Sequence, residues 1–219
     1  MSAEYTLIVG TKDWSSWSLR PWLALRHAGV AFKEKLIPLR RDSSSPEIFK
    51  YSPSGRVPAL IVEEAGKSAL IWDSLAICET IAERHREAQL WPADPLVRAE
   101  ARSYAAEMHS GFPDLREQLS MDFARRLPTP PLREATRTQI ARIQQAWRDA
   151  LMRYGDSGGF LFGRFSIADC MYAPVVSRFK SYGIELDEPL TGYAARMMAL
   201  PAMQDWGKAA KAEVDAGLA

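Results

Sequence analysis

The pattern of strands and helices in the first third of the chain is its strongest constraint on the fold. Short apolar runs typical of strands alternate there with segments whose apolar residues recur at helical spacing. The order is strand, helix, strand, short helix, two strands and a helix. The rest of the chain shows no convincing strand pattern. The sequence therefore predicts an α/β domain followed by an all-helical domain.

The elements of the first domain are bounded by turn residues and polar loops. Strands are expected at 5–9, 32–39, 59–62 and 68–71, and helices at 16–28, 46–51 and 73–84. The first two strands, joined by a helix, would be parallel with a right-handed crossover. The last two would form a hairpin. This βαβαββα order is that of a thioredoxin-like domain.

Prolines mark where the second domain begins. Pro92 and Pro95 indicate a linker, so we expect domains at residues 1–84 and 98–219 with a linker at 85–97. Further helices are expected within 96–126, around 140–151, from 166 onward and after 201.

The composition of the chain argues against some classes of binding partner. Lys and Arg number 28 against 27 Asp and Glu, without the basic excess typical of nucleic-acid-binding proteins. No apolar run approaches the roughly 20 residues that span a bilayer, and the first residues lack the layout of a signal peptide. Cys78 and Cys170, far apart in sequence, are typical of buried thiols in a reducing compartment. We expect a cytoplasmic protein that binds no nucleic acid, membrane or metal.

Two short motifs point to a ligand site. A proline directly before a strand can adopt the cis form, and a cis Val57-Pro58 bond would leave an unpaired backbone edge for an extended peptide. Asp73 and Ser74 begin the last helix of the first domain, and a helix N-terminus favours a carboxylate. An ordinary trans proline and a simple N-cap are the plainer alternatives. Together the motifs favour a small, peptide-like ligand that carries a carboxylate.

The chain resembles the cytosolic glutathione transferases from Tyr5 to about Trp206. The resemblance is carried by these two motifs, by the segment Ser15–Arg20 and by the run Ser166–Asp169. The serine-rich segment is similar to the Ser-Ser-Cys-x-x-Arg signature of the zeta class, which includes maleylacetoacetate isomerases. Trp17 stands where that class has cysteine, and Arg56 stands where a glutamine usually precedes Val-Pro. The resemblance implies a homodimeric enzyme with glutathione as co-substrate and no permanently bound cofactor.

The resemblance also implies residue roles. A serine hydroxyl would donate a hydrogen bond to the glutathione sulfur and favour its thiolate. Ser15 is the first candidate and Ser16 the second; the plainer alternative is that Ser16 only caps the helix and Ser15 is solvated. Ser74 would bind the γ-glutamyl carboxylate and Asp73 the ammonium group. The expected glutathione-binding residues are Ser15, Trp17, Arg56, Val57, Pro58, Asp73 and Ser74.

The second substrate would bind near the first long helix of the helical domain. Arg20, Met108 and His109 are expected in that pocket, with Arg20 as a candidate for an anion. A surface arginine and a structural histidine are open alternatives. Ser166 and Asp169 resemble the family's N-capping box and are assigned to folding.

The leading interpretation is a glutathione transferase that conjugates glutathione to small electrophiles. Three alternatives stay open: a glutathione-dependent cis–trans isomerase of the maleylacetoacetate type, a glutathione-dependent peroxidase, and a non-catalytic ligand-binding module of the same fold. Trp17 counts against the isomerase, whereas the retained serine, Val-Pro and Asp-Ser motifs count against the module.

Overall fold

A four-stranded mixed sheet forms the centre of the first domain. The computed structural model describes residues 3–219, with only the backbone at Ser157. The strands are β1 (Glu4–Gly10), β2 (Lys33–Ile37), β3 (Ala59–Glu64) and β4 (Lys67–Trp72), in the order β2-β1-β3-β4. β1 and β2 run parallel, and β3 is antiparallel to both of its neighbours. The expected thioredoxin-like arrangement is confirmed.

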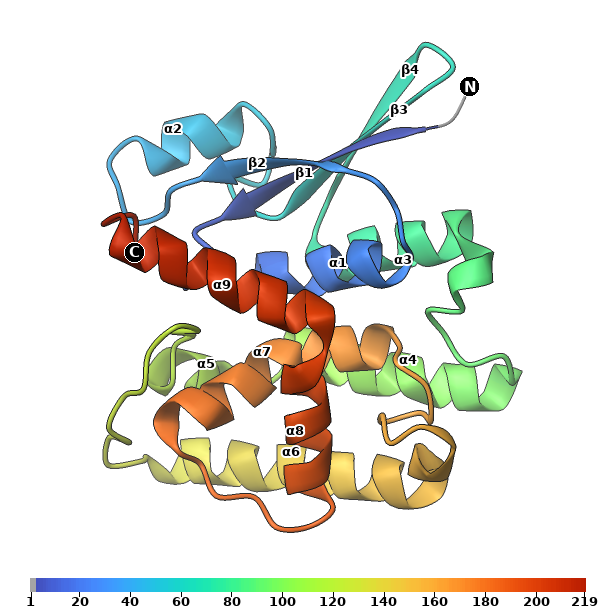
Figure 1. Cartoon of the computed structure of the whole chain (residues 1–219), viewed down its shortest axis with the longest axis vertical. Coiled ribbons are helices and arrows are strands. Elements are labelled where there is room, and N and C mark those ends of the chain that lie inside the picture. The colour runs from blue at the N-terminus through green and yellow to red at the C-terminus, as the bar shows by residue number, and fades with distance from the viewer. Residues whose placement is uncertain (1–2) are drawn as a thin grey trace.

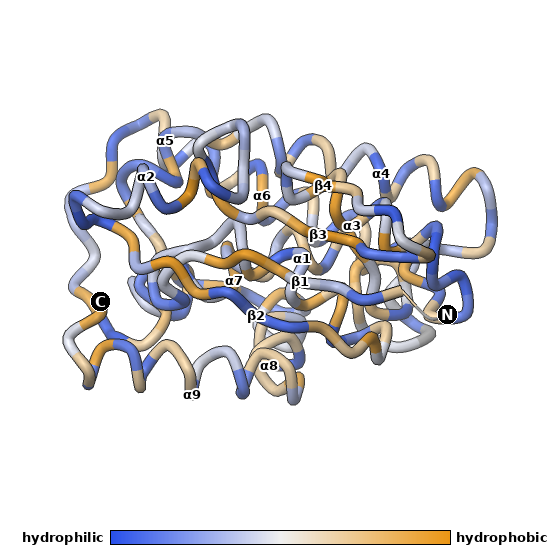
Figure 2. The backbone as a smooth tube through the Cα atoms, turned by 90° about the horizontal axis from the view of Figure 1, so that it is seen from above, coloured by the Kyte–Doolittle hydropathy of each residue, from blue (hydrophilic) through white to orange (hydrophobic). Residues whose placement is uncertain are grey.

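Three helices accompany the sheet: α1 (Ser16–His27), α2 (Ser44–Phe49) and α3 (Ser74–Arg84). α1 and α3 lie together on the face towards the helical domain, whereas α2 lies on the other side (Figure 1). The tube of β1 and β3 is largely hydrophobic, and that of β2 is mostly hydrophilic (Figure 2). This difference follows from position, because central strands are covered on both faces and edge strands are not.

The second domain is helical. Its helices are α4 (Pro95–Ser110), α5 (Pro113–Gln118), α6 (Glu134–Tyr154), α7 (Ile167–Tyr182), α8 (Leu190–Ala199) and α9 (Pro201–Asp215), with single 3-10 turns at Arg86–Ala88 and Gly155–Ser157. Every residue of α7 except Lys180 is buried. α7 is therefore the central helix around which the others pack.

The segment after α5 differs from the sequence prediction. Helical runs were expected within 96–126, but helix ends at Gln118 and residues 119–133 form none. The backbone of this segment bonds to distant partners instead: Phe123 N donates to Asp13 O and Leu127 N to Ser181 O. Tertiary hydrogen bonds thus replace the local helical ones.

Two further helix boundaries differ from the prediction. α4 begins at Pro95, inside the expected linker, because the Asp94 carboxylate accepts hydrogen bonds from Leu96 N and Val97 N and caps the helix. Proline at the first helical position suits this start. α8 was not anticipated.

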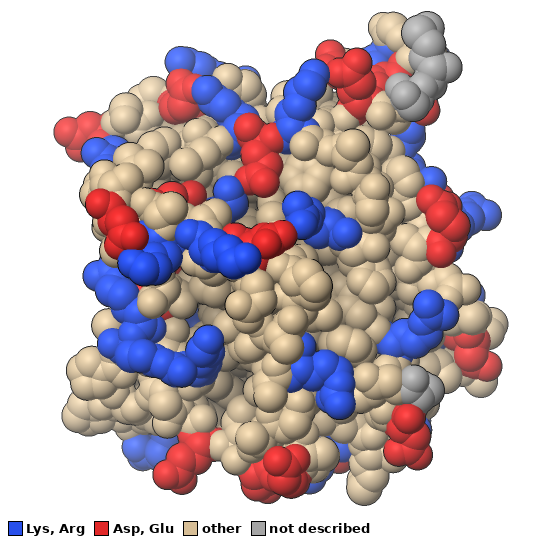
Figure 3. Space-filling model, in the orientation of Figure 1, with Lys and Arg blue, Asp and Glu red and all other residues tan. Residues whose placement is uncertain are grey.

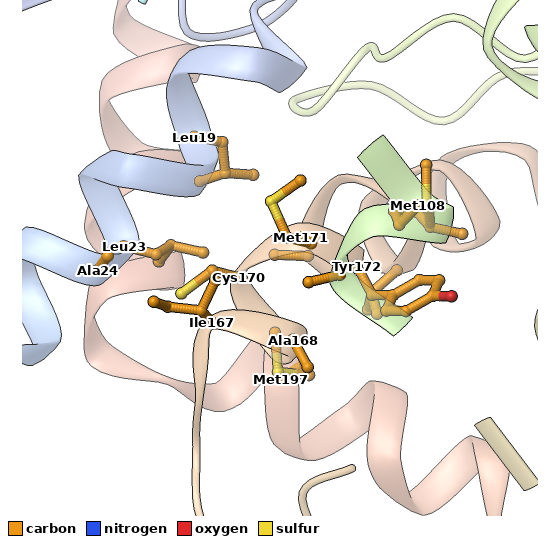
Figure 4. Packing of buried hydrophobic residues seen from close by; sticks show 14 of the residues in the cluster. Leu19, Leu23, Ala24, Met108, Ile167, Ala168, Cys170, Met171, Tyr172 and Met197 are labelled. Atoms are coloured by element: carbon orange, nitrogen blue, oxygen red, sulfur yellow. The ribbon is translucent and has the colours of Figure 1, made fainter. Parts of the chain in front are cut away.

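A continuous hydrophobic core joins the two domains through α1 and α7. Leu19 and Leu23 of α1 face the start of α7, where Cys170 and Met171 lie beside them (Figure 4). All four side chains are almost completely buried. The helical domain therefore packs directly on the helix that opens the ligand site.

Asp169 holds the start of α7 in place, as the sequence predicted. Its carboxylate accepts hydrogen bonds from Ser166 N and Oγ at 2.9 and 3.0 Å. It also accepts from Leu161 N at 3.1 Å and from the Tyr193 hydroxyl of α8 at 3.2 Å. Burial raises the pKa of Asp169 to about 6. The capping box is confirmed, and it also fastens the preceding loop and α8 to α7.

Replacing Asp169 by alanine should destabilise the protein by about 3–5 kcal/mol, because several buried donors lose their acceptor at once. Urea unfolding followed by circular dichroism measures the change. The matched control is Glu83→Ala, which removes an exposed carboxylate from α3 and should change stability by less than about 0.5 kcal/mol. Equal stabilities of the two variants would contradict the role of Asp169.

Candidate functional site

A cleft at the junction of the two domains brings together most of the predicted glutathione-binding residues. Six of them line it: Trp17, Arg56, Val57, Pro58, Asp73 and Ser74. His109, expected at the second substrate, lines the same cleft. Ser54, Trp72 and Arg116 complete the lining and were not predicted.

The loop before β3 forms one wall of the cleft. The Val57–Pro58 peptide bond is cis, as expected from the sequence. Gly55 precedes it with φ 67°, a conformation that favours glycine, and a Cβ there would lie 2.6 Å from the Phe49 ring. The turn that presents Val57 thus depends on glycine.

The N-terminus of α3 lines the same cleft, beside the Val57–Pro58 loop. Asp73 caps the helix with one carboxylate oxygen, which accepts from Leu75 N at 2.9 Å and from Ala76 N at 3.1 Å. Ser74 is only 2% exposed, and its hydroxyl has no hydrogen-bond partner among the described residues. Buried polar groups are almost always hydrogen-bonded. An unpaired hydroxyl lining a cleft therefore points to a ligand group.

A histidine links this helix to the helical domain. His109 Nε2 of α4 lies 3.0 Å from the second carboxylate oxygen of Asp73. The imidazole also packs edge-on against Trp17, with ring centres 5.4 Å apart. Both oxygens of Asp73 thus have protein partners, so a ligand ammonium group would share this carboxylate with His109.

The two candidate thiol-activating serines lie at the start of α1, and neither lines the cleft. The Ser15 hydroxyl donates to Ser18 Oγ at 2.7 Å, and Ser18 Oγ also accepts from Gly10 N at 3.2 Å. The Ser16 hydroxyl makes no hydrogen bond within residues 3–219. Ser15 thus points towards Ser18, a partner that the sequence interpretation did not single out.

The loop that carries these serines is held from two sides. The Trp206 indole of α9 donates to Lys12 O at 3.0 Å, and Glu213 accepts from Lys12 N. On the other side, Ala124 N donates to the fully buried carboxylate of Asp13 at 2.8 Å. α9 and the segment after α5 thus hold the loop before α1 in place. These contacts join residues that are distant in sequence, so no local sequence pattern predicts them.

Two predicted pocket residues lie elsewhere. Met108 is completely buried and projects into the core towards Tyr172 (Figure 4), because its face of α4 packs against α7. The expectation that it contacts a second substrate is corrected. Arg20 is also completely buried, with its guanidinium carbon 3.8 Å from the centre of the Trp17 ring. It lies behind the cleft wall and not in it.

The remaining features of the structure concern metals, membranes and charge. Residues 3–219 contain no group of three or more His, Cys, Asp or Glu side chains that could hold a metal ion. Over the same range, none of the helices combines the length and the apolar character that a membrane crossing requires. On the face in Figure 3, acidic and basic side chains lie interspersed, and neither sign dominates it.

Comparisons with known proteins identify a family for both domains. Residues 14–84 match the family model "Glutathione S-transferase, N-terminal domain", and residues 130–207 match "Glutathione S-transferase, C-terminal domain". The chain is 29% identical to a maleylacetoacetate isomerase of Pseudomonas aeruginosa over 79% of its own length and 80% of that protein. It is 32% identical to a probable maleylacetoacetate isomerase of Caenorhabditis elegans, but this match spans only 46% of the chain and 44% of that relative.

A solved structure extends the likeness to the whole fold. The maleylacetoacetate isomerase of Anaeromyxobacter dehalogenans, with glutathione bound in its active site, superposes with a TM-score of 0.69 at 27% identity. The match covers 94% of this chain and 95% of that one. Another structure of the same protein holds dicarboxyethyl glutathione and citrate in the active site. The chain belongs to the glutathione S-transferase superfamily, a family of glutathione-dependent enzymes, and is zeta-like within it.

Proposed function

We propose that this protein is a glutathione transferase that binds glutathione in the interdomain cleft and conjugates it to small electrophiles. The observation that carries the proposal is that two binding elements line one cleft. The Val57–Pro58 loop directly precedes β3, and the unpaired Ser74 hydroxyl lies just after the end of β4, beside it. A tripeptide that adds to a strand end and carries a carboxylate suits both.

The γ-glutamyl and cysteinyl parts of glutathione each have a partner in this arrangement. The γ-glutamyl carboxylate accepts a hydrogen bond from the Ser74 hydroxyl at the positive end of the α3 dipole. The ammonium group pairs with Asp73, beside His109. The cysteinyl backbone runs along Val57, which directs the thiol towards the start of α1.

Thiolate stabilisation is the chemical contribution of the serine turn. We assign it to Ser15, whose hydroxyl turns from Ser18 to the sulfur when glutathione binds. Ser18 can then donate its own proton to Ser15 while it still accepts from Gly10 N. Hydrogen bonds in such a chain strengthen one another. Ser18 is therefore a positioning residue that acts through Ser15.

The reaction itself needs little further chemistry. The thiolate sulfur attacks an electrophilic carbon and forms a C–S bond, while the leaving group departs with the bonding electron pair. Where the electrophile is an activated alkene, no group leaves. The electron pair of the double bond forms a bond to a proton. Proximity of the two bound reactants supplies much of the acceleration.

A homodimer and a cytoplasmic location remain part of the proposal. The dimer is supported by Leu70 and Trp72, two large apolar side chains exposed on the same face of the edge strand β4. Exposed apolar groups that lie close together on a surface often mark contacts between subunits.

Ser15→Ala should raise the thiol pKa of bound glutathione by about 1–2 units, because a hydrogen bond to a charged group contributes roughly 1.5–3 kcal/mol. Activity near neutral pH should fall about 10–100-fold and recover as the pH rises through the new pKa. Ultraviolet absorbance of the bound thiolate against pH measures the shift.

Two further variants complete that experiment. Ser16→Ala should leave the bound thiol pKa unchanged, and Ser18→Ala should raise it by less than Ser15→Ala does. A shift in Ser16→Ala without one in Ser15→Ala would transfer the role to Ser16 and contradict the assignment.

Isomerisation of maleylacetoacetate is the second candidate function. It is favoured by Arg116, a cation in the cleft wall suited to a carboxylate substrate, and by the maleylacetoacetate isomerases among the relatives. Here the sulfur adds to the cis double bond, the adduct rotates about the resulting single bond, and the sulfur leaves with its electron pair.

Proton NMR distinguishes the two candidates by the fate of glutathione. With 1-chloro-2,4-dinitrobenzene as electrophile, a transferase consumes one glutathione per product formed, because the C–S bond persists. With maleylacetoacetate, an isomerase forms the trans product while free glutathione stays constant. The proposal predicts the first result; isomerisation without any conjugation would replace it with the second candidate.

A further inference from the structure

The Asp73 carboxylate already has three donors around it before any ligand binds. One oxygen, Oδ1, accepts from Leu75 N at 2.9 Å and from Ala76 N at 3.1 Å. The other, Oδ2, lies 3.0 Å from His109 Nε2. A carboxylate offers about four acceptor positions. The free position is therefore on Oδ2, and the place of His109 decides which side of that oxygen is left open.

The hydrogen of this contact belongs on the imidazole. A carboxylate can only accept, so Nε2 must carry the hydrogen, and a neutral imidazole carries hydrogen on one nitrogen. Nδ1 is buried and has no hydrogen-bond partner within residues 3–219. A hydrogen there would be an unpaired buried donor, which is costly. In this tautomer His109 donates to Asp73 without cancelling the negative charge that attracts an ammonium group.

The backbone of Asp73 also needs support. Its φ is 81° and its ψ 131°, a combination that residues with a side chain rarely adopt and that persists only where surrounding contacts hold it. The two cap bonds hold Oδ1, and a carboxylate held at one oxygen can pivot about it. The contact with His109 holds Oδ2 as well, so the plane of the carboxylate is fixed.

His109 is itself held by the helical domain. Its ring stands edge-on to Trp17, with ring centres 5.4 Å apart and the planes at 81°. On the other side of α4, Ala105 and Met108 are buried, and α4 packs against α7. The imidazole therefore connects the α3 cap to the core of the second domain.

We propose that His109 is a positioning residue for glutathione that acts through Asp73. It keeps the one free acceptor position of the carboxylate open for the ammonium group of the γ-glutamyl part, and it thereby favours peptides that carry a free α-amino group. This role rests on the proposed function, in which glutathione occupies the cleft. His109 was expected beside the second substrate; in this role it serves the first.

Two ligands that differ only in the ammonium group test this role: glutathione and its deamino analogue, glutaryl-cysteinyl-glycine. Calorimetric titration measures the affinity of each. His109→Leu, which keeps a side chain against Trp17 but has no donor, should weaken glutathione binding about three- to tenfold, as expected for one lost hydrogen bond. Its affinity for the analogue should stay unchanged. His109→Gln, which retains an N–H donor, should restore most of the glutathione affinity. The control His27→Ala removes an exposed histidine outside the cleft and should match the wild type.

Steady-state kinetics and a second background show where His109 acts. With 1-chloro-2,4-dinitrobenzene as electrophile, His109→Leu should raise the KM for glutathione and leave kcat and the KM for the electrophile unchanged. Asp73→Asn removes the charge but keeps an oxygen for the α3 cap. In that background His109→Leu should weaken glutathione binding no further, because residues that act as one unit are not additive.

The outcomes separate this role from the proposed function. If the wild type binds glutathione, equal weakening of both ligands in His109→Leu would overturn the positioning role alone, as would a raised KM for the electrophile with unchanged glutathione affinity. A general loss of folded protein lowers the stoichiometry of binding for both ligands and not the affinity for one of them. Absence of glutathione binding to the wild type would overturn the proposed function and this role with it.

Discussion

The packing of α1 between the sheet and α7 is the contact on which the rest of the structure depends. The same helix presents Trp17 to the cleft, buries Leu19 against α7 and carries Arg20 between the domains. Neither domain has a complete core without it, because a single hydrophobic cluster runs through both. The cleft is therefore built on the interdomain core, to which residues far along the chain contribute.

Hydrogen bonds between segments that are distant in sequence also make the start of α1 depend on the last helix, α9. α9 fixes Lys12 through Trp206 and Glu213, and the segment after α5 fixes Asp13. Both contacts lie directly before the serine turn. The position of the Ser15 hydroxyl is thus set by elements that come more than 100 residues later in the chain. The proposed thiolate-stabilising serine is therefore held in position although it lies on a loop.

The sequence predicted the features that local chemistry determines. Strand and helix order, the Asp73 cap and the Ser166–Asp169 capping box all follow from residue types at short spacing. It did not predict the irregular segment after α5, whose backbone bonds to Asp13 and Ser181. Local propensity cannot register such partners, because they are distant in sequence.

The residues of the candidate site fall into the same two groups: those that a local motif predicts and those that only the tertiary structure brings together. Val57–Pro58, Asp73 and Ser74 were found from motifs and lie around one cleft. Their neighbours Arg116 and Trp72 carry no motif and were missed. Met108 was misplaced because helical position alone does not say which face of α4 meets α7. The sequence suggested Arg20 as an anion ligand, but its complete burial appears only in three dimensions.

The measurement that tests the central claim most directly is calorimetric titration of glutathione into the wild-type protein and into Ser74→Ala. The account predicts saturable binding to the wild type and an affinity at least tenfold weaker in the variant, because the α-carboxylate loses a charge-assisted hydrogen bond of roughly 1.5–3 kcal/mol. Ser74 lies at a helix start, so circular dichroism must show that the variant is folded. Absence of binding to the wild type, or equal affinity in both, would contradict the placement of glutathione in this cleft.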